Sequence, residues 1–346
     1  MASSHKAAVL VAPDRIELQE VATPALQPYE ALVRVRAAGV CGTDLAIWSG
    51  DYPVPLPLVL GHEWVGAVEA VGARRDAHLL GRRVVGEINN HCLARRAETL
   101  CAACAAGLPT HCLARTVTGI VRHPGTFAER AVIPAPNLLP IPDDLPDRAA
   151  ILIEPLAAAL QTFALTPLAE GETVAVLGCG RLGVLVALVA QALGARVLPF
   201  AHRAEHRDLA ARLGVNATLV SNDEAIVEHV RQATNGLGAD IVVEATASPK
   251  GLALALDCVR PRGTVALKST PGVPVERFDL TRVVVSEVRL QGSRCGDFAR
   301  AIAFWGRRRP PLEALVVAEF PLDRTAQALA RARQPGKVLI KTDFGF

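Results

Sequence analysis

The stretch GHEWVGAVEAVG, residues 61–72, places His62 and Glu63 side by side at the start of a strand-like apolar run. Twenty-one residues before His62, Cys41 stands in the motif CGTD, where Gly42 frees the backbone so that the cysteine can face a metal. A thiolate, an imidazole and a carboxylate together form a donor set that selects zinc. The two motifs therefore predict a metal site built from Cys41, His62 and Glu63.

Two further residues of CGTD bear on this site. Thr43 would place a hydroxyl group beside the metal, and Asp44 would accept a hydrogen bond from the ligand histidine. The alternative for CGTD taken alone is a turn with one buried free cysteine. The GHE motif downstream favours the metal site.

A second motif, GCGRLG at residues 178–183, follows the apolar run TVAVLG and precedes the helical pattern VLVALVAQAL. In a G-x-G-x-x-G sequence between a strand and a helix, the first glycine allows the tight turn and the second lets the backbone approach a pyrophosphate. The third lets the helix pack on the strand. We therefore expect Gly178, Gly180 and Gly183, with the intervening Arg181 and Leu182, to bind a dinucleotide.

Strand-like and helix-like segments alternate after this fingerprint. The strand-like segments ARVLPF, DIVVEAT and GTVALKS are separated by the helix-like segments AEHRDLAARLG and DEAIVEHVRQAT, and GLALALDCVR also reads as a helix. This alternation predicts an α/β domain with a doubly wound parallel sheet. Residues 6–38 instead carry short alternating apolar segments with turn signals between them, and they predict a β-rich N-terminal region.

A cluster of cysteines lies between these two regions. Cys101, Cys104 and Cys112 have the spacing C-x2-C-x7-C, which is typical of a zinc-binding lobe. A zinc ion held only by protein ligands is structural, because no position is left for a substrate. The cluster thus predicts a second zinc, separate from the site at His62.

With CGTD, GHE, the cysteine cluster and GCGRLG in place, the sequence resembles the zinc-dependent medium-chain alcohol dehydrogenases from about residue 6 to about residue 341. The resemblance implies a β-rich, GroES-like catalytic domain over residues 1–146 and 290–346. It also implies a Rossmann dinucleotide-binding domain over residues 147–289.

The same resemblance assigns the catalytic residues. Cys41 and His62 would hold the catalytic zinc, with Glu63 and Glu154 as alternative carboxylate ligands. Glu154 belongs to the segment EPLA, whose glutamate in the family lies at the cleft between the domains and reaches the catalytic zinc. Thr43 would shuttle the proton. Many members pass that proton to a histidine five residues after the zinc cysteine, where this chain has Ala46, so the outer relay must differ.

The fourth ligand of the structural zinc has two candidates. The family pattern has a cysteine three residues before Cys101, and this chain has Glu98 there. Either Glu98 is itself the ligand, or the loop carries an insertion and Cys92 is the ligand. Cys92 lies eleven residues after Gly81, the usual separation in the family, and its thiolate matches the other three in softness. We expect Cys92, and hence two zinc ions per chain.

The resemblance also locates the end of the second strand of the Rossmann domain at Ala201. NAD enzymes of this fold place an acidic residue there, which bonds the ribose 2′-hydroxyl. Ala201 offers no carboxylate, and the following His202 and Arg203 offer an imidazole and a guanidinium that suits a phosphate. These residues predict NADP(H) as the cofactor in preference to NAD(H).

Composition limits the remaining possibilities. The chain has 346 residues and a net charge of +3, with no basic run of the kind that binds nucleic acid. No apolar run reaches the length of a membrane span and the N-terminus lacks a signal-peptide core, so we expect a cytoplasmic protein without a membrane partner. The expected partner is a small alcohol or carbonyl substrate, and the expected assembly is a homodimer or homotetramer.

Two other functions stay possible at this point. A zinc-independent reductase of enones or quinones from the same superfamily would generally lack the zinc ligands Cys41 and His62 and the cysteine lobe. A non-catalytic protein could keep the fold and bind a dinucleotide without turnover. The complete set of expected metal ligands favours a zinc-dependent oxidoreductase over both.

Overall fold

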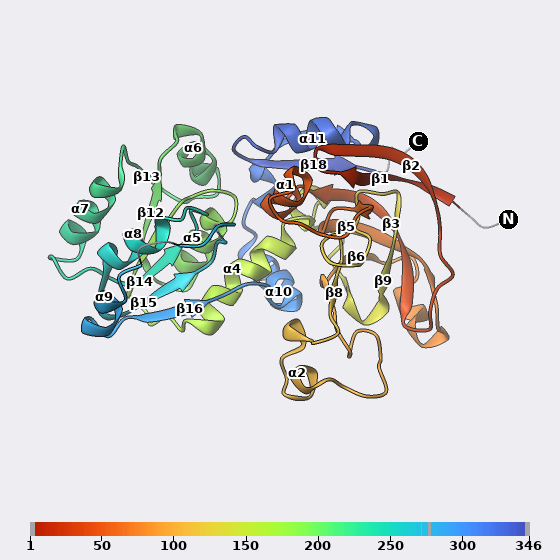
Figure 1. Ribbon diagram of the computed structural model, residues 1–346, viewed down its shortest axis with the longest axis horizontal. Helices are drawn as coiled ribbons and strands as arrows, with labels where there is room; N and C mark the ends of the chain where they lie inside the picture. Colours follow the sequence, from red (N-terminus) through yellow and green to blue (C-terminus); the bar gives the residue numbers. More distant parts are fainter. Residues whose placement is uncertain (1–3, 271, 276–277, 343–346) are drawn as a thin grey trace. The chain divides into compact units, whose positions relative to one another are not determined.

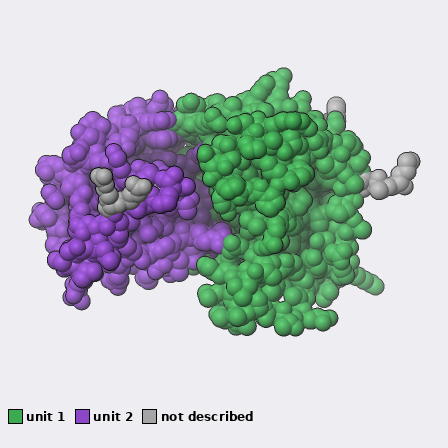
Figure 2. All heavy atoms as spheres, viewed as in Figure 1, with its two compact units in different colours: residues 1–154, 298–346 green, residues 155–297 purple. Residues whose placement is uncertain are grey.

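The computed structural model describes residues 4–270, 272–275 and 278–342. The chain forms two compact units, unit 1 from Met1–Glu154 and Phe298–Phe346 and unit 2 from Pro155–Asp297, which are coloured separately in Figure 2. In the described part of the chain, no helix combines the length and the apolar character needed to cross a membrane.

Unit 1 is built mainly of strands. They are β1 (Ser4–Ala12), β2 (Arg15–Ala22), β3 (Glu30–Gly39), β4 (Leu58–Val59), β5 (Glu63–Val71), β6 (Arg83–Gly86), β7 (Asn89–Asn90), β8 (Thr116–Val117), β9 (Arg130–Pro134), β10 (Leu138–Pro140), β17 (Val316–Pro321) and β18 (Lys337–Lys341). The larger sheet has the order β10-β6-β5-β3-β18-β17, with β9 also paired to β3; β2-β1-β4 and β7-β8 form smaller sheets.

Helices of unit 1 are mostly short. They are α1 (Gly42–Ser49), α2 (Ala102–Ala105), α3 (Asp147–Ala150), α10 (Phe298–Arg308) and α11 (Thr325–Arg331), and α4 (Ile153–Leu165) begins in unit 1 and continues into unit 2. Figure 1 shows the segment around α2 standing away from the sheets of unit 1.

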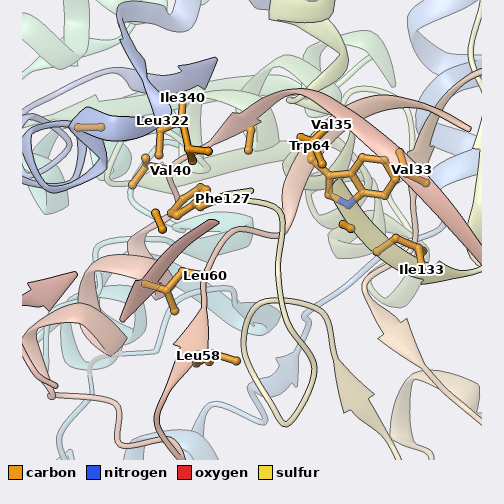
Figure 3. Close-up of a cluster of buried hydrophobic side chains, with 14 of the residues drawn as sticks. Val33, Val35, Val40, Leu58, Leu60, Trp64, Phe127, Ile133, Leu322 and Ile340 are labelled. Atoms are coloured by element: carbon orange, nitrogen blue, oxygen red, sulfur yellow. The ribbon is translucent and has the colours of Figure 1, made fainter. Parts of the chain in front are cut away.

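The alternating side chains of β3 and β5 explain why the larger sheet forms. Val33 and Val35 of β3 are fully buried and pack in one core with Trp64 of β5 and Ile133 of β9. Figure 3 shows this core. The antiparallel register pairs Gly39 of β3 with Glu63 of β5, so the residues just after β3 lie beside the residues just before β5.

Unit 2 contains the predicted parallel sheet. Its strands are β11 (Thr173–Leu177), β12 (Arg196–Ala201), β13 (Thr218–Leu219), β14 (Ala239–Glu244), β15 (Val259–Leu267) and β16 (Arg289–Gly292). Neighbouring strands are parallel, in the order β13-β12-β11-β14-β15-β16. In chain order this is 3-2-1-4-5-6, the doubly wound arrangement whose strand order reverses between β11 and β14. The α/β prediction is confirmed.

The helices of unit 2 connect these strands. They are α5 (Gly183–Ala192), α6 (Ala204–Arg212), α7 (Asp223–Ala233), α8 (Gly251–Cys258) and α9 (Leu280–Val285). Strand β11 is wholly buried and so is most of α5, as expected for a strand covered on both faces.

The units divide a little later in the chain than the domain boundaries proposed from the sequence. Strand β16 pairs with β15 over residues 289–292, so the boundary expected at 289/290 lies inside a strand of unit 2. The compact units divide instead after residue 154 and after residue 297.

Candidate active site and metal centres

The register of β3 and β5 brings the CGTD and GHE motifs together. Cys41 lies two residues beyond the end of β3, and His62 immediately precedes β5. Cys41 Sγ, a ring nitrogen of His62 and a carboxylate oxygen of Glu63 all lie within 4.8 Å of one another. Gly61 has φ of +97°, and a Cβ at that position would lie 2.5 Å from the Phe127 ring. Position 61 therefore requires glycine for the GHE motif to pack against Phe127.

Asp44 holds the two motifs in place. It is fully buried, and its Oδ2 accepts a hydrogen bond from the backbone N–H of Cys41 at 2.8 Å. Its Oδ1 accepts one from the N–H of Gly61 at 3.2 Å and lies 3.3 Å from Nδ1 of His62. One carboxylate thus orients both the cysteine and the histidine, as is usual for groups behind metal ligands.

The surroundings of His62 favour a cation on its ring. Burial by itself opposes the charged form. The Asp44 carboxylate and the Cys41 sulfur outweigh that effect and raise the pKa of His62 well above its usual value. A bound metal ion takes the place of such a proton. The donor types and the charge at this position therefore fit zinc.

Glu63 is bound by a lysine from the far end of the chain. Both side chains are almost fully buried, and Lys337 Nζ donates a hydrogen bond to Glu63 Oε2 and another to the Val40 carbonyl at 3.2 Å. Lys337 was not among the site residues predicted from the sequence. The signal was a lysine at the start of the apolar run KVLI, because a lysine buried within a strand needs a carboxylate partner.

Glu154 lies in the first turn of α4 and is half-buried. Burial raises its pKa to about 7; the charge of His62 opposes this rise and the charge of Glu63 adds to it. Among the described residues, the group within 4.8 Å at this site is Cys41, His62 and Glu63 and does not include Glu154. Glu154 is therefore within electrostatic reach of the site without belonging to this group.

The second cluster gathers the cysteines of the predicted lobe. The sulfur atoms of Cys92, Cys101, Cys104 and Cys112 all lie within 4.8 Å of one another, with Cys92 and Cys112 3.5 Å apart. Glu98 is exposed and is not part of the group. The segment after Cys92 forms hydrogen-bonded turns, in which the N–H of Ala97 donates to the Cys92 carbonyl at 3.0 Å.

The lobe favours a thiolate at Cys101, whereas burial raises the pKa of Cys104 to about 12. The backbone N–H groups of Cys104 and Leu113 lower the pKa of Cys101 to about 6, and the Leu113 N–H donates to Cys101 Sγ at 3.4 Å. Four converging sulfur atoms with such donors match the all-cysteine set of a structural zinc site. The sulfur chemistry therefore fits a closed metal site.

The dinucleotide fingerprint lies between β11 and α5. Gly178 has φ of +89°, and a Cβ there would lie 2.9 Å from the Ala245 carbonyl. A Cβ on Gly183 would lie 2.0 Å from the Gly178 carbonyl, whereas one on Gly180 would meet nothing within 4 Å. Gly178 and Gly183 are thus required for packing, and Gly180 leaves open space where a pyrophosphate can approach the backbone. Arg181 and Leu182 of the same turn are half-buried.

Strand β12 ends at Ala201, which is buried. The next two residues, His202 and Arg203, are exposed at the carboxyl end of the strand. His202 Nε2 lies 3.4 Å from Oδ1 of Asp223, the first residue of α7. The structure thus places an imidazole and a guanidinium where the sequence predicted them, together with the Asp223 carboxylate, which was not predicted.

Two family models match the chain. Residues 27–143 match the alcohol dehydrogenase GroES-like domain, and residues 182–306 match the zinc-binding dehydrogenase domain. The curated L-threonine 3-dehydrogenase of Chelativorans sp. (strain BNC1) is 34% identical over 299 residues, which is 84% of each chain. The chain belongs to the zinc-dependent medium-chain alcohol dehydrogenase family.

Solved structures of other dehydrogenases share this fold. A zinc-binding dehydrogenase from Sinorhizobium meliloti 1021, bound to NADP, matches with a TM-score of 0.87 and 29% identity, covering 98% of this chain and 100% of that chain. Alcohol dehydrogenase TADH from Thermus sp. ATN1 matches with a TM-score of 0.84 and 32% identity, over 98% of this chain and 100% of that chain.

This dehydrogenase is a zinc-dependent oxidoreductase that acts on alcohols with a nicotinamide cofactor. The predicted combination of a GroES-like domain and a Rossmann domain is confirmed, and so is the predicted enzyme class. The zinc-independent reductase and the non-catalytic binding protein, the two alternatives considered from the sequence, are not favoured by these relatives.

Proposed function

We propose that this dehydrogenase transfers a hydride between a small secondary alcohol and NADP(H), at a catalytic zinc held by Cys41, His62 and the carboxylate of Glu63 or Glu154. The observation that carries the proposal is the approach of Cys41, His62 and Glu63 to within 4.8 Å of one another around the buried carboxylate of Asp44. The charge on Lys337 neutralises Glu63 and so favours Glu154 as the carboxylate ligand.

Each residue of the site has a definite part in this reaction. Zinc, when bound, supplies a Lewis acid for the substrate oxygen. The hydride is exchanged with the nicotinamide ring, whose chemistry belongs to the cofactor. Asp44, whose Oδ1 lies 3.3 Å from His62 Nδ1, orients the His62 ring for the metal. Thr43, whose Oγ1 lies 3.9 Å from Cys41 Sγ, accepts the proton of the substrate hydroxyl and passes it toward solvent.

L-Threonine is the first substrate to test. The curated relatives include L-threonine 3-dehydrogenases at 30–34% identity, and L-threonine carries a secondary alcohol. A panel of L-threonine, polyols, simple secondary alcohols and aldehydes should be assayed with both nicotinamide cofactors. Turnover of a secondary alcohol supports the proposal, and turnover confined to primary alcohols would contradict it. We place the reaction in the cytoplasm, as the sequence predicts.

We also propose that each chain binds two zinc ions, the second one structural and held by Cys92, Cys101, Cys104 and Cys112. The support is the separation of two donor groups of different chemistry, one mixed and one all-sulfur. Elemental analysis of protein purified without chelators should give close to two zinc per chain. In the Cys41→Ser variant about one zinc should remain and activity should be lost, because the lobe keeps its own ligands.

The proposed preference for NADP(H) depends on Arg203. Its guanidinium follows the carboxyl end of β12, where Ala201 offers no carboxylate to bond a ribose diol or repel a phosphate. A related structure was solved with NADP. The carboxylate of Asp223 acts in the opposite direction, but it faces His202, so Arg203 keeps its charge for the phosphate.

We further propose a homodimer formed through unit 2. Strand β16 is the last strand in its sheet, so one edge of it lacks a partner strand in the described chain. Beside it in sequence, α9 exposes Leu280 by 61%, Val284 by 67% and Val285 by 75%. An open strand edge with exposed branched apolar side chains is typical of a self-complementary interface, because a second copy can pair with the edge and cover the side chains.

A further inference from the structure

A buried carboxylate organises the turn that follows β14. Glu244 is 4% exposed, and its Oε1 accepts hydrogen bonds from the backbone N–H of Thr246 at 2.7 Å and from the Thr246 hydroxyl at 2.5 Å. Its Oε2 accepts a bond from the Ser269 hydroxyl at 2.5 Å. We call Glu244, Thr246 and Ser269 the carboxylate clasp.

The two hydroxyls of the carboxylate clasp bind the backbone of the same turn. Thr246 Oγ1 accepts a hydrogen bond from the N–H of Ser248 at 3.0 Å, and Ser269 Oγ accepts one from the N–H of Ala247 at 2.8 Å. Ala247 is exposed and has φ of +58°. A residue with a Cβ seldom adopts this conformation, and it persists only where its surroundings impose it. The clasp supplies those surroundings.

The turn lies at the edge of the sheet where a dinucleotide binds. A Cβ added to Gly178 of the fingerprint would lie 2.9 Å from the Ala245 carbonyl and 3.1 Å from Cα of Thr246, so the turn packs directly against the fingerprint. Strands β11 and β14 are parallel neighbours, and the strand order reverses between them. In open α/β sheets, ligands bind outside the carboxyl ends of the strands at this reversal.

Both oxygens of the Glu244 side chain accept hydrogen bonds, two from Thr246 and one from Ser269. Because the carboxyl group receives the hydroxyl protons of Thr246 and Ser269, each hydroxyl oxygen stays free to accept a backbone N–H. Position 244 therefore links both hydroxyls to the backbone of the turn.

We propose that the carboxylate clasp positions the bound dinucleotide, by holding the 245–248 turn in its binding conformation before the cofactor arrives. A turn fixed in advance spares the cofactor the entropy of ordering it. The proposal rests on the dinucleotide site proposed above. Glu244, Thr246 and Ser269 are positioning residues, which act on the cofactor through the exposed backbone around Ala247.

The experiment compares two half-buried hydroxyl residues of unit 2 in the full-length zinc-loaded enzyme. Ser269→Ala removes a clasp hydroxyl. Thr234→Ala is the control, because the Thr234 hydroxyl donates to the Val230 carbonyl at 2.7 Å and accepts from the N–H of Gly238 at 2.9 Å. The neighbouring Ala233 carbonyl is bonded by Arg196, the first residue of β12, so Thr234 lies at the opposite edge of the sheet from the 245–248 turn. Dissociation constants for NADPH and NADH are measured by fluorescence titration, with kcat, KM and the melting temperature of each variant.

Ser269→Ala should weaken dinucleotide binding roughly three- to tenfold, as expected for the loss of one net hydrogen bond. Its kcat at saturating cofactor should stay within about twofold of wild type, and the control should match wild type in both respects. A merely structural role would instead lower the melting temperature and leave both dissociation constants unchanged.

A second substitution tests whether the lost dinucleotide affinity can be restored. Ala247→Gly, added to Ser269→Ala, should restore most of the lost affinity, because glycine adopts φ of +58° without strain. Unchanged affinity in Ser269→Ala, or failure of the double variant to recover any of it, would overturn the clasp as a positioning device. A wild-type enzyme that binds neither NADPH nor NADH would overturn the proposed function itself.

Discussion

Replacement of Lys337 by methionine tests the electrostatics of the catalytic site most directly. The change keeps the length and apolar body of the side chain but removes the ammonium group, which donates to Glu63 Oε2 and to the Val40 carbonyl. Glu63 is 1% exposed, so its carboxylate would be left buried without its cation. Removing one partner of a buried ion pair typically costs about 3–5 kcal/mol.

Lys341 of the same strand provides a matched control. Its Nζ pairs with Glu319 at 2.6 Å, but the Lys341 side chain is 49% exposed. A pair at the surface contributes about 0–1 kcal/mol, so Lys341→Met should leave stability nearly unchanged. Because unit 1 has on the order of 200 residues, each kcal/mol corresponds to about 2–4 °C in its melting temperature. Lys337→Met should therefore lower that temperature by roughly 6–20 °C.

Scanning calorimetry of the zinc-loaded wild type and both variants measures this difference. The double variant Lys337→Met/Glu63→Gln should recover part of the lost stability, because a neutral amide is less costly to bury than an unpaired carboxylate. A melting temperature for Lys337→Met as high as that for Lys341→Met would refute the reasoning. So would a double variant no more stable than Lys337→Met alone.

Three further predictions concern the metals, the cofactor and the assembly. Cys92→Ser should lose the lobe zinc, measured by elemental analysis, and should lower the melting temperature, whereas Glu98→Ala should do neither. Loss of the lobe zinc in Glu98→Ala but not in Cys92→Ser would mean that the fourth ligand is wrongly assigned. Arg203→Ala should weaken NADP binding about tenfold to hundredfold, since a charge-assisted contact contributes roughly 1.5–3 kcal/mol, and should hardly change NAD binding. Arg207→Ala is the control, because the Arg207 guanidinium already pairs with Asp208 at 2.8 Å. Tighter binding of NAD than of NADP by the wild type would contradict the preference. Val285→Asp should convert the dimer to a monomer in light scattering, because the charge would be buried at the proposed interface; an unchanged mass would exclude α9 from it.

Local patterns allowed the prediction of the Rossmann unit. Its strands are continuous apolar runs and its glycine fingerprint has a fixed spacing, so both are visible within a short window of sequence. The domain boundary near residue 290 was less accessible. Strand β16, RLQG, has no apolar run of its own and is a strand because it pairs with β15. Pairing with a distant neighbour is a tertiary effect that the short segment does not encode by itself.

Some residues of the candidate site could likewise be predicted from local sequence, and others could not. Cys41, His62 and the lobe cysteines could be found from residue type and spacing, because metal ligands need particular atoms. Lys337 could not be placed, since it lies 274 residues from Glu63 and reaches it only through the register of β18 on β3. The carboxylate clasp was also hidden, because glutamate, threonine and serine are ordinary residues at strand ends.

The position of β18 has a consequence for synthesis on the ribosome. In the larger sheet this strand lies between β3 and β17, so the last described strand of the chain completes a sheet whose first strand, β3, begins at Glu30. Unit 2 is continuous and can fold as soon as residue 297 has emerged, whereas unit 1 stays incomplete until residue 341. During that interval Glu63 has no ammonium partner. A nascent chain therefore passes through a stage in which all of unit 2 is available to fold while the larger sheet of unit 1 still lacks β18, and chaperones and proteases would meet that unpaired strand edge.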